Sequence, residues 1–225
     1  IAPVIPASIN ATVEATMYQQ AIEDLILLVD LPSSSGTSYA WENGGEMETK
    51  GMEFALGLNL NKFWNFHMTY YTNESEVTKL TVDPYNFGGF ATFLGTYRIE
   101  EGYSPTAIVG SEMTDGKHDV LGDENPDYRV SFRNSFSFGP VALSFLIDHK
   151  AGGHAINLAN LIYDLGGTTV DFADNGGDRL GGLGAVTQPY VESTTYTALR
   201  YLSLTYTLPE SMSDKFGLSY LQLGL

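Results

Sequence analysis

The feature that most constrains the fold is a regular alternation of apolar and polar residues between Asp127 and Lys150, interrupted once by Gly139-Pro140. The apolar row consists of Tyr128, Val130, Phe132, Phe136 and Phe138, broken only by Asn134, and then of Val141, Leu143, Phe145 and Ile147. A period of two places one row of side chains on each face of a strand. The Gly-Pro break predicts a turn, and therefore an antiparallel hairpin. Each arm has about ten residues, enough for a tilted strand to cross the hydrocarbon core of a bilayer.

Other segments repeat this pattern and predict about nine strands in all. Residues 9–18 alternate, and residues 52–61 and 64–70 form a second hairpin that turns at Lys62-Phe63. Residues 202–208 alternate in the same way, and weaker signals lie at 91–99, 106–110 and 221–225. Such strands fit either a sandwich with one wet face or a membrane barrel with lipid outside and a polar lumen inside.

The lengths of the connections distinguish these two architectures. Short links at 62–63, 139–140 and 209–215 alternate with long segments at about 20–48, 73–126 and 151–193, which are rich in turn residues. Outer-membrane barrels have short periplasmic turns at one end and long extracellular loops at the other. The sequence therefore predicts an all-β, antiparallel up-and-down transmembrane β-barrel, with residues 1–225 as one partial barrel domain. The segment is expected to be incomplete, because an odd number of strands would close with a parallel pair.

Composition excludes several classes of protein. The longest unbroken apolar run, Leu25 to Val29, is far shorter than a transmembrane helix requires. The net charge of −16 argues against a nucleic-acid partner, and the absence of cysteine excludes disulfides and thiolate metal sites. Residues 1–9 lack the basic and apolar regions of a signal peptide, so we expect the chain to begin within mature sequence.

Several stretches resemble one family. They are Gly122-Asp123-Glu124-Asn125-Pro126-Asp127-Tyr128, Phe132-Arg133-Asn134-Ser135-Phe136, Leu143-Ser144-Phe145-Leu146-Ile147-Asp148 with Gly152-Gly153 and Asn157, Leu31 to Gly36, Asn43 to Met47 with Lys50 to Glu53, and Leu199 to Pro209. In this order and spacing they are similar to the C-terminal barrel region of the SusC/RagA family of TonB-dependent outer-membrane transporters.

The resemblance implies a barrel of about 22 strands with a plugged lumen, in the outer membrane of a Gram-negative bacterium. It also implies import of oligosaccharides or peptides powered through the TonB complex, a SusD-like surface lipoprotein as partner, and contact with outer-membrane lipid and lipopolysaccharide. The family's plug domain and TonB box have no counterpart in the chain, so no TonB-coupling residue is assigned.

Candidate site residues come first from the polar rows of the strands. We expect these side chains to face the lumen and to contact substrate or plug; they are Asn10, Glu14, Glu53, Asn59, His67, Arg129 and Arg133. The alternative is that any water-filled lumen is polar. Trp41, Tyr85, Phe87 and Phe90 lie in predicted outer segments, where they would stack on sugar rings, pack within the loops or form an aromatic girdle at the membrane interface.

Acidic loop residues are weak metal candidates. Asp115, Asp119 and Asp123 carry the oxygen ligands that calcium prefers, but their spacing does not match an EF-hand. A solvated acidic loop, or carboxylates that share divalent cations with lipopolysaccharide, are the other interpretations. No nucleophile elbow, phosphate-binding loop or metalloprotease motif is present, so we expect neither an enzyme nor a cofactor other than calcium in the acidic loops.

Three function classes follow from this sequence. The first is active import through a TonB-dependent barrel, and the second is a passive structural or adhesive outer-membrane barrel. The third is a secreted soluble β-protein that binds glycans, in which the apolar residues Phe54, Leu56, Phe66 and Phe145 would face a protein core.

Overall fold

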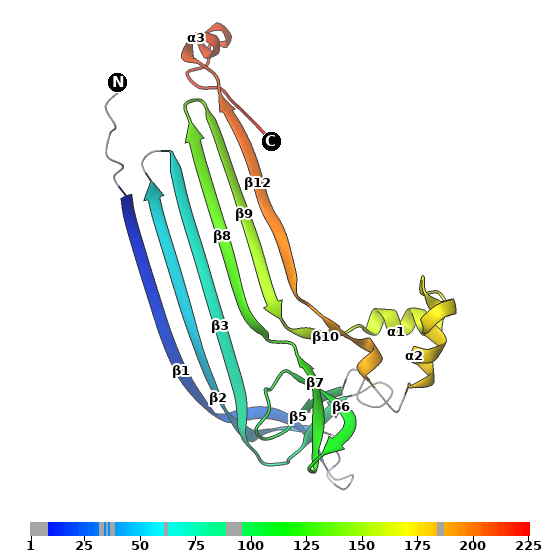
Figure 1. Ribbon diagram of the computed structural model, residues 1–225. Coiled ribbons are helices and arrows are strands. Elements are labelled where there is room, and N and C mark those ends of the chain that lie inside the picture. Colours follow the sequence, from blue (N-terminus) through cyan, green and yellow to red (C-terminus); the bar gives the residue numbers. More distant parts are fainter. Residues whose placement is uncertain are drawn as a thin grey trace.

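A single antiparallel sheet of seven strands dominates the molecule (Figure 1). The computed structural model describes residues 9–31, 34, 36, 39–60, 63–88, 96–183 and 187–225. The strands, in their spatial order, are β1 (Ile9–Asp30), β2 (Tyr39–Leu60), β3 (Trp64–Leu80), β8 (Pro126–Phe138), β9 (Val141–Gly152), β12 (Tyr196–Thr207) and β13 (Gln222–Gly224). Each strand pairs with a neighbour that follows it in this order, which confirms the up-and-down arrangement.

The register aligns the apolar rows of all these strands into one continuous face. Phe132 lies opposite Met68 on one side and Ile147 on the other, and Phe54 lies opposite Ala15 and Tyr70. The rings of Trp64 and Phe136 stack with centroids 5.8 Å apart. Asn134, the polar exception in the row, accepts a hydrogen bond from the Trp64 indole at 3.1 Å.

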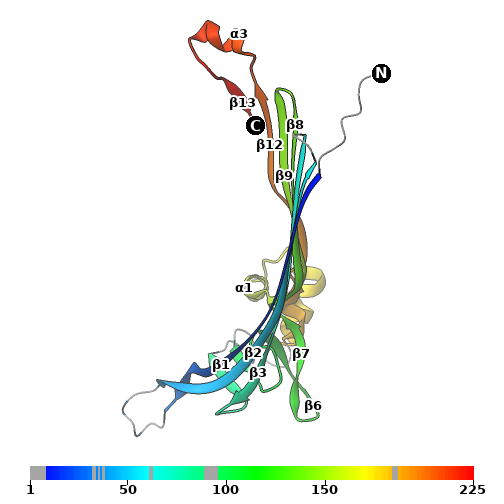
Figure 2. The same ribbon diagram turned by 90° about the vertical axis from the view of Figure 1, so that its left-hand side faces the viewer.

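Viewed edge-on, the sheet is one curved layer (Figure 2). Val13 and Leu202, on the apolar face, are 62% and 60% exposed. No second sheet covers this face anywhere in the described ranges, so the two stacked layers of a sandwich are not formed. The residues expected to face either lipid or a core therefore have no protein core to face here.

The connections separate by length only in part as predicted. The β2–β3 and β8–β9 turns lie at one end of the sheet, and the link between β12 and β13, which holds α3 (Glu210–Ser213) and the 3-10 turn η4 (Asp214–Phe216), lies at this end as well (Figure 1). The two longest connections, from β3 to β8 and from β9 to β12, lie at the opposite end, together with the link from β1 to β2, which is shorter than the link from β12 to β13. Lys62 of the predicted turn falls outside the described residues, whereas Gly139, at φ +59°, adopts the left-handed conformation that suits glycine.

The predicted loop at 20–48 is wrong over most of its length, because β1 continues to Asp30 and β2 begins at Tyr39. Gly44 and Gly45 suggested a turn but lie within β2, where the register shifts between Leu25 and Ile26. A Cβ on Gly45 would lie 2.7 Å from the Lys79 carbonyl oxygen, and one on Gly44 would lie 2.7 Å from Leu27 Cδ1. Within the strand, Gly44 is therefore the extra residue of a β-bulge, and Gly45 allows the backbone of β3 to approach closely.

The segment at 73–126 is also more ordered than predicted. It contains two separate hairpins, β4 (Tyr85–Gly88) with β5 (Thr96–Ile99), and β6 (Ala107–Thr114) with β7 (Lys117–Asp123). Residues 96–99 and 107–110 of the predicted strands belong to these hairpins and not to the main sheet, which has seven strands where about nine are predicted. Part of the first signal, residues 91–95, lies outside the described residues.

The β4–β5 hairpin packs against the part of β1 and β2 that extends beyond the rest of the sheet, at about residues 20–30 and 39–48. Val77, Leu80, Tyr85 and Ile99 form a buried cluster, against which Leu27 and Val29 of β1 pack. This cluster gives the long-loop end a small core of its own.

The predicted loop at 151–193 folds into a helical lobe. It contains β10 (His154–Ile156), α1 (Leu158–Leu165), the π-helical turn η2 (Phe172–Gly176), α2 (Gly177–Gly181), the 3-10 turn η3 (Gln188–Tyr190) and β11 (Val191–Ser193). Its helices are too short for a clear helical period in the sequence. None of the helices in the described ranges has the length and apolar character to cross a membrane.

The close approach of Gly45 to β3, next to the bulge at Gly44, generates a prediction. In Gly45→Ala, the new Cβ collides with the backbone of β3, so we expect the β1–β2 extension to lose about 1–3 kcal/mol of local stability. Amide hydrogen exchange over residues 20–48 measures this loss. Gly177→Ala is the control, because nothing lies within 4 Å of its Cβ position. Unchanged exchange in Gly45→Ala would show that the sheet absorbs the methyl group.

Candidate functional site

The polar rows of the strands form the face opposite to the apolar one, and they hold the predicted lumen residues. Asn10 pairs with Asn59, and His67 pairs with Arg133. Glu53 lies opposite Tyr71, which in turn lies opposite Arg129. The structure therefore places Asn10, Glu14, Glu53, Asn59, His67, Arg129 and Arg133 on one face.

These residues divide into separate hollows along the face. Asn59, His67 and Arg133 line one hollow, together with Thr12, Asn65 and Ser135. Glu14 and Glu53 line a second, and Arg129 lines a third with Asp148 and Arg200. The first hollow is polar and basic, and the second is acidic. The third contains arginine side chains that are hydrogen-bonded to the carboxylate of Asp148.

The third hollow is organised by Asp148 of β9, which is only 3% exposed. Arg129 donates from Nε to Oδ1 at 2.8 Å and from Nη2 to Oδ2 at 2.6 Å. Tyr196 donates to Oδ2 at 2.8 Å, and Arg200 donates to the same oxygen from Nε at 3.2 Å. The Arg200 guanidinium also lies over the Tyr196 ring, 4.8 Å from its centroid. One carboxylate thus fixes two guanidinium groups from strands on either side of it.

A β-bulge brings Arg200 into this cluster. Leu199 pairs with Ile147 on the apolar face, but the next pairing joins Tyr201 to Leu146, so Arg200 is the extra residue. Leu202 then pairs with Phe145, back on the apolar face. The register shift allows the neighbours Arg200 and Tyr201 both to lie with the polar rows. Simple alternation cannot predict this placement.

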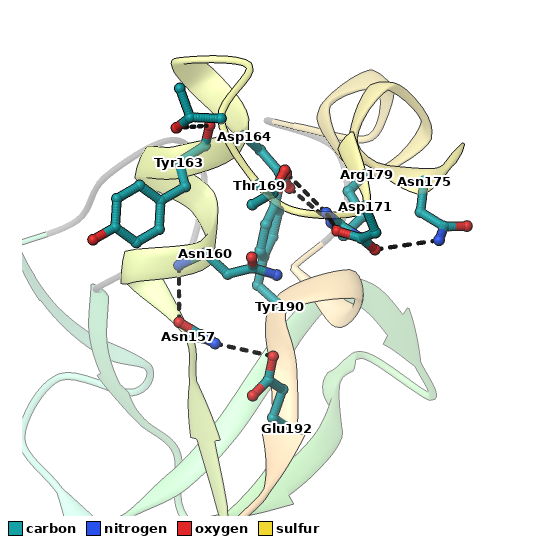
Figure 3. Close-up of polar contacts among 11 residues, drawn as sticks. Asn157, Asn160, Tyr163, Asp164, Thr169, Asp171, Asn175, Arg179, Tyr190 and Glu192 are labelled. Atoms are coloured by element: carbon teal, nitrogen blue, oxygen red, sulfur yellow. Dashed lines mark hydrogen bonds and ion pairs between the residues drawn. The ribbon is translucent and has the colours of Figure 1, made fainter. Parts of the chain in front are cut away.

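A second charged cluster stabilises the helical lobe at the long-loop end (Figure 3). Asp164 of α1 is fully buried and accepts hydrogen bonds from Arg179 Nε at 2.7 Å and Nη2 at 2.8 Å. Arg179 also binds both oxygens of Asp171, at 2.8 and 3.0 Å. Tyr190, also buried, donates to Asp164 at 3.1 Å. Arg179 therefore ties α1, η2 and α2 into one unit.

These contacts shift the pKa values of Asp164, Asp171 and Tyr190. The Arg179 guanidinium holds the pKa of Asp164 well below its usual range and lowers the pKa of Asp171 to about 2. Burial raises the pKa of the Tyr190 hydroxyl, and its hydrogen bond to Asp164 acts in the same direction. Both aspartates therefore stay charged throughout the neutral and mildly acidic range.

The three weak metal candidates do not form a site together. Asp115 is in the β6–β7 turn, and Asp119 lies within β7. Asp123 accepts hydrogen bonds from Thr106 Oγ1 and from the Asn125 amide. No group of three or more potential metal-ligating side chains comes together among the described residues.

The loop aromatics differ in their availability. Trp41, on the extension of β2, is 71% exposed. Tyr85 is only 6% exposed, and its hydroxyl donates to the Leu28 carbonyl at 2.6 Å. Of the interpretations given for Tyr85, the structure therefore supports packing within the loops and not a surface for stacking on sugars. Of Phe87 only the backbone is described, and Phe90 lies outside the described residues.

The Arg179 cluster generates a prediction about pH. Because the pKa values of Asp164 and Asp171 are lowered by folding, their stabilising effect is complete above the usual value of 3.8 and is lost as the pH falls toward about 2. We expect pepsin to leave residues 157–183 intact at about pH 4 and to cleave them at about pH 2. Arg179→Gln should be cleaved at both values. Lys79→Gln, which breaks only an exposed ion pair with Glu46, is the control. Resistance of Arg179→Gln at about pH 4 equal to that of wild type would contradict the prediction.

Comparisons with known proteins agree with this geometry. No family model matches the chain. The TonB-dependent receptors P3 and P26 of Formosa agariphila are 23% and 24% identical to it, over 92% and 91% of the chain. The chain spans 26% of the length of each of these relatives.

Solved structures show the same fold. The RagAB peptide transporter superimposes with a TM-score of 0.70 at 19% identity, and the match covers 95% of this chain and 28% of that one. The RagAB peptide importer in its closed-closed state gives a TM-score of 0.65 at 20% identity, covering 96% of this chain and 30% of that one. By sequence and by fold, the chain is therefore similar to a segment of the barrel of SusC/RagA-like, TonB-dependent transporters.

Proposed function

We propose that the chain forms part of the wall of an outer-membrane transporter that imports oligosaccharides or peptides with energy supplied through TonB. The names of the related receptors and of the RagAB structures support this proposal. The RagAB structures are named for peptides and the names of the two receptors give no substrate, and nothing in the fold of the wall separates a glycan from a peptide.

One observation carries the proposal: a single-layer sheet with one continuous apolar face and one polar face. Transfer of apolar surface from water is favourable by about 25 cal/mol per Å², so a face of this size exposed to water would be strongly unfavourable. Against hydrocarbon the same face is stable, provided that every backbone group within the bilayer is paired along the sheet. The two faces then separate lipid from an enclosed polar space.

The ends of the sheet give the orientation and the partners. The short turns lie on the periplasmic side and the helical lobe and hairpins on the extracellular side. A SusD-like surface lipoprotein would contact the extracellular side, where the lipopolysaccharide also lies. The TonB complex would act through parts of the transporter other than this segment.

The orientation of the faces can be tested with two adjacent residues. Phe54→Arg places a charge on the apolar face near the middle of a spanning strand, and we expect it to destabilise the folded transporter by about 2–4 kcal/mol. Ala55→Arg places the same charge on the polar face, opposite Glu14, and should have little effect. Urea titration of the full-length protein in lipid vesicles measures both. Equal costs would contradict the assignment of the faces.

The import function can be tested in cells. A strain that depends on the full-length protein should accumulate labelled short peptides or oligosaccharides, and this uptake should stop when TonB is deleted or the proton gradient is collapsed. Uptake that persists without TonB would favour a passive barrel instead. A protein recovered in the soluble fraction would favour the glycan-binding alternative.

A further inference from the structure

The basic residues of this acidic chain are concentrated on one part of the polar face. The chain has a net charge of −16 and only 11 lysines and arginines. Four of them, Arg129, Arg133, Lys150 and Arg200, lie in the polar rows of the adjacent strands β8, β9 and β12. Asp148 is the one acidic residue in the paired, described part of those rows. We call these four residues the basic wall.

The carboxylate of Asp148, which lies among the four residues of the basic wall, is already occupied by hydrogen bonds from neighbouring side chains. Asp148 accepts hydrogen bonds from Arg129, Tyr196 and Arg200. Its side chain is 4% exposed, so a cationic ligand has no access to its charge. When the charge of Asp148 is counted against the four basic residues, the net charge of this part of the polar face is positive.

The basic wall retains hydrogen-bond donors that no described residue uses. Arg200 contacts Asp148 and Tyr196, but its side chain is 50% exposed and most of its five N–H donors remain available. Arg133 has no hydrogen-bond or ion-pair partner among the described residues, and the same holds for Lys150. Asp148 and the Tyr196 ring hold the Arg200 guanidinium in place, which reduces the entropy lost when it binds a ligand.

The position of the basic wall makes it accessible from the extracellular side. Arg129 is near the start of β8, Lys150 near the end of β9 and Arg200 near the start of β12, so all three lie toward the long-loop end. Arg133 lies further along the same face and lines its own polar hollow with Asn59 and His67. A molecule that enters from the loops therefore meets the Asp148 cluster before it meets Arg133.

We propose that the basic wall binds carboxylate groups of the transported molecule, so that the substrate of this transporter is an anionic oligosaccharide or peptide. The proposal rests on the proposed import function and specifies its substrate class. A planar guanidinium fork binds a carboxylate through two parallel hydrogen bonds, which a neutral sugar or amide cannot match. The acidic loops repel anions only weakly at this site, because physiological salt screens charges beyond about 8 Å.

A binding experiment with paired probes tests the substrate class. The full-length transporter, purified in detergent, is incubated with tetragalacturonate and its methyl ester, and with the peptides Ala-Glu-Ala-Glu and Ala-Gln-Ala-Gln. Mass spectrometry then measures what remains bound after desalting. We expect the wild-type protein to retain an acidic probe over its neutral counterpart, and added salt to weaken this retention.

Variants of the basic wall test the residues. Arg200→Gln should reduce retention of the acidic probe about tenfold, since a hydrogen bond to a charged group is lost, and the double variant with Arg133→Gln should reduce it further. Arg200→Lys keeps the charge but loses the fork, so it should restore retention only in part. Lys79→Gln removes a positive charge outside the basic wall and should behave as wild type. Heat-dependent electrophoretic mobility confirms that each variant is folded.

Two results would overturn the proposal. One is retention of neutral probes as strong as that of acidic ones, and the other is acidic retention unaffected in the double variant. The double variant could instead loosen a domain held inside the barrel, which new protease cleavage with unchanged probe binding would reveal. In that case the basic wall binds that domain and not the substrate. TonB-dependent uptake together with any of these results would leave the import function intact and reject only the binding of substrate carboxylates by the basic wall. Absence of both uptake and binding would reject the import function itself.

Discussion

The structure depends on the register of backbone hydrogen bonds across a single layer of strands. Since side chains alternate along a strand, a slip of one residue between any two strands would exchange their apolar and polar faces. In this chain the register holds from β1 to β12, so that Phe54, Phe132 and Phe145 lie on the same face although they come from different hairpins. In a bilayer this pairing has a second role, because unpaired backbone groups have no water to bind.

Departures from regular pairing give the sheet its particular features. The bulge at Gly44 and Gly45 lies where β1 and β2 continue beyond the part of the sheet that β8 and β9 share, and the extension then covers a small core around Tyr85 and Ile99. The bulge at Arg200 adds a second guanidinium to Asp148. Both sites show the same principle: one extra residue in a strand redirects the chain or a side chain without breaking the sheet.

The charged clusters of the loops and of the polar face have different physical roles. Asp164 is fully buried, and Arg179 together with Tyr190 compensates its charge, so the cluster fixes the fold of the helical lobe. Asp148 is almost as buried, but the arginines bound to it are half exposed and present donors to the polar space. A buried carboxylate orders its partners in both cases, and the exposure of those partners decides whether a further ligand can bind.

The sequence by itself determined the two-faced strands, the Gly139-Pro140 turn and the positions of the two longest links, because alternation and turn chemistry are local properties of the chain. It also placed Glu53, Asn59, His67, Arg129 and Arg133 in the polar rows, since membership of a row needs only the period of two. The tertiary structure alone decided that residues 20–30 and 39–48 are strand, that two predicted strands belong to separate hairpins, that Tyr85 is buried and that Arg200 joins Asp148. The last two depend on contacts between residues far apart in the chain, 57 residues for Tyr85 and Leu28 and 52 for Arg200 and Asp148. The alternation of residues along one strand does not predict which distant segments contact each other, so these features could be seen only in the folded structure.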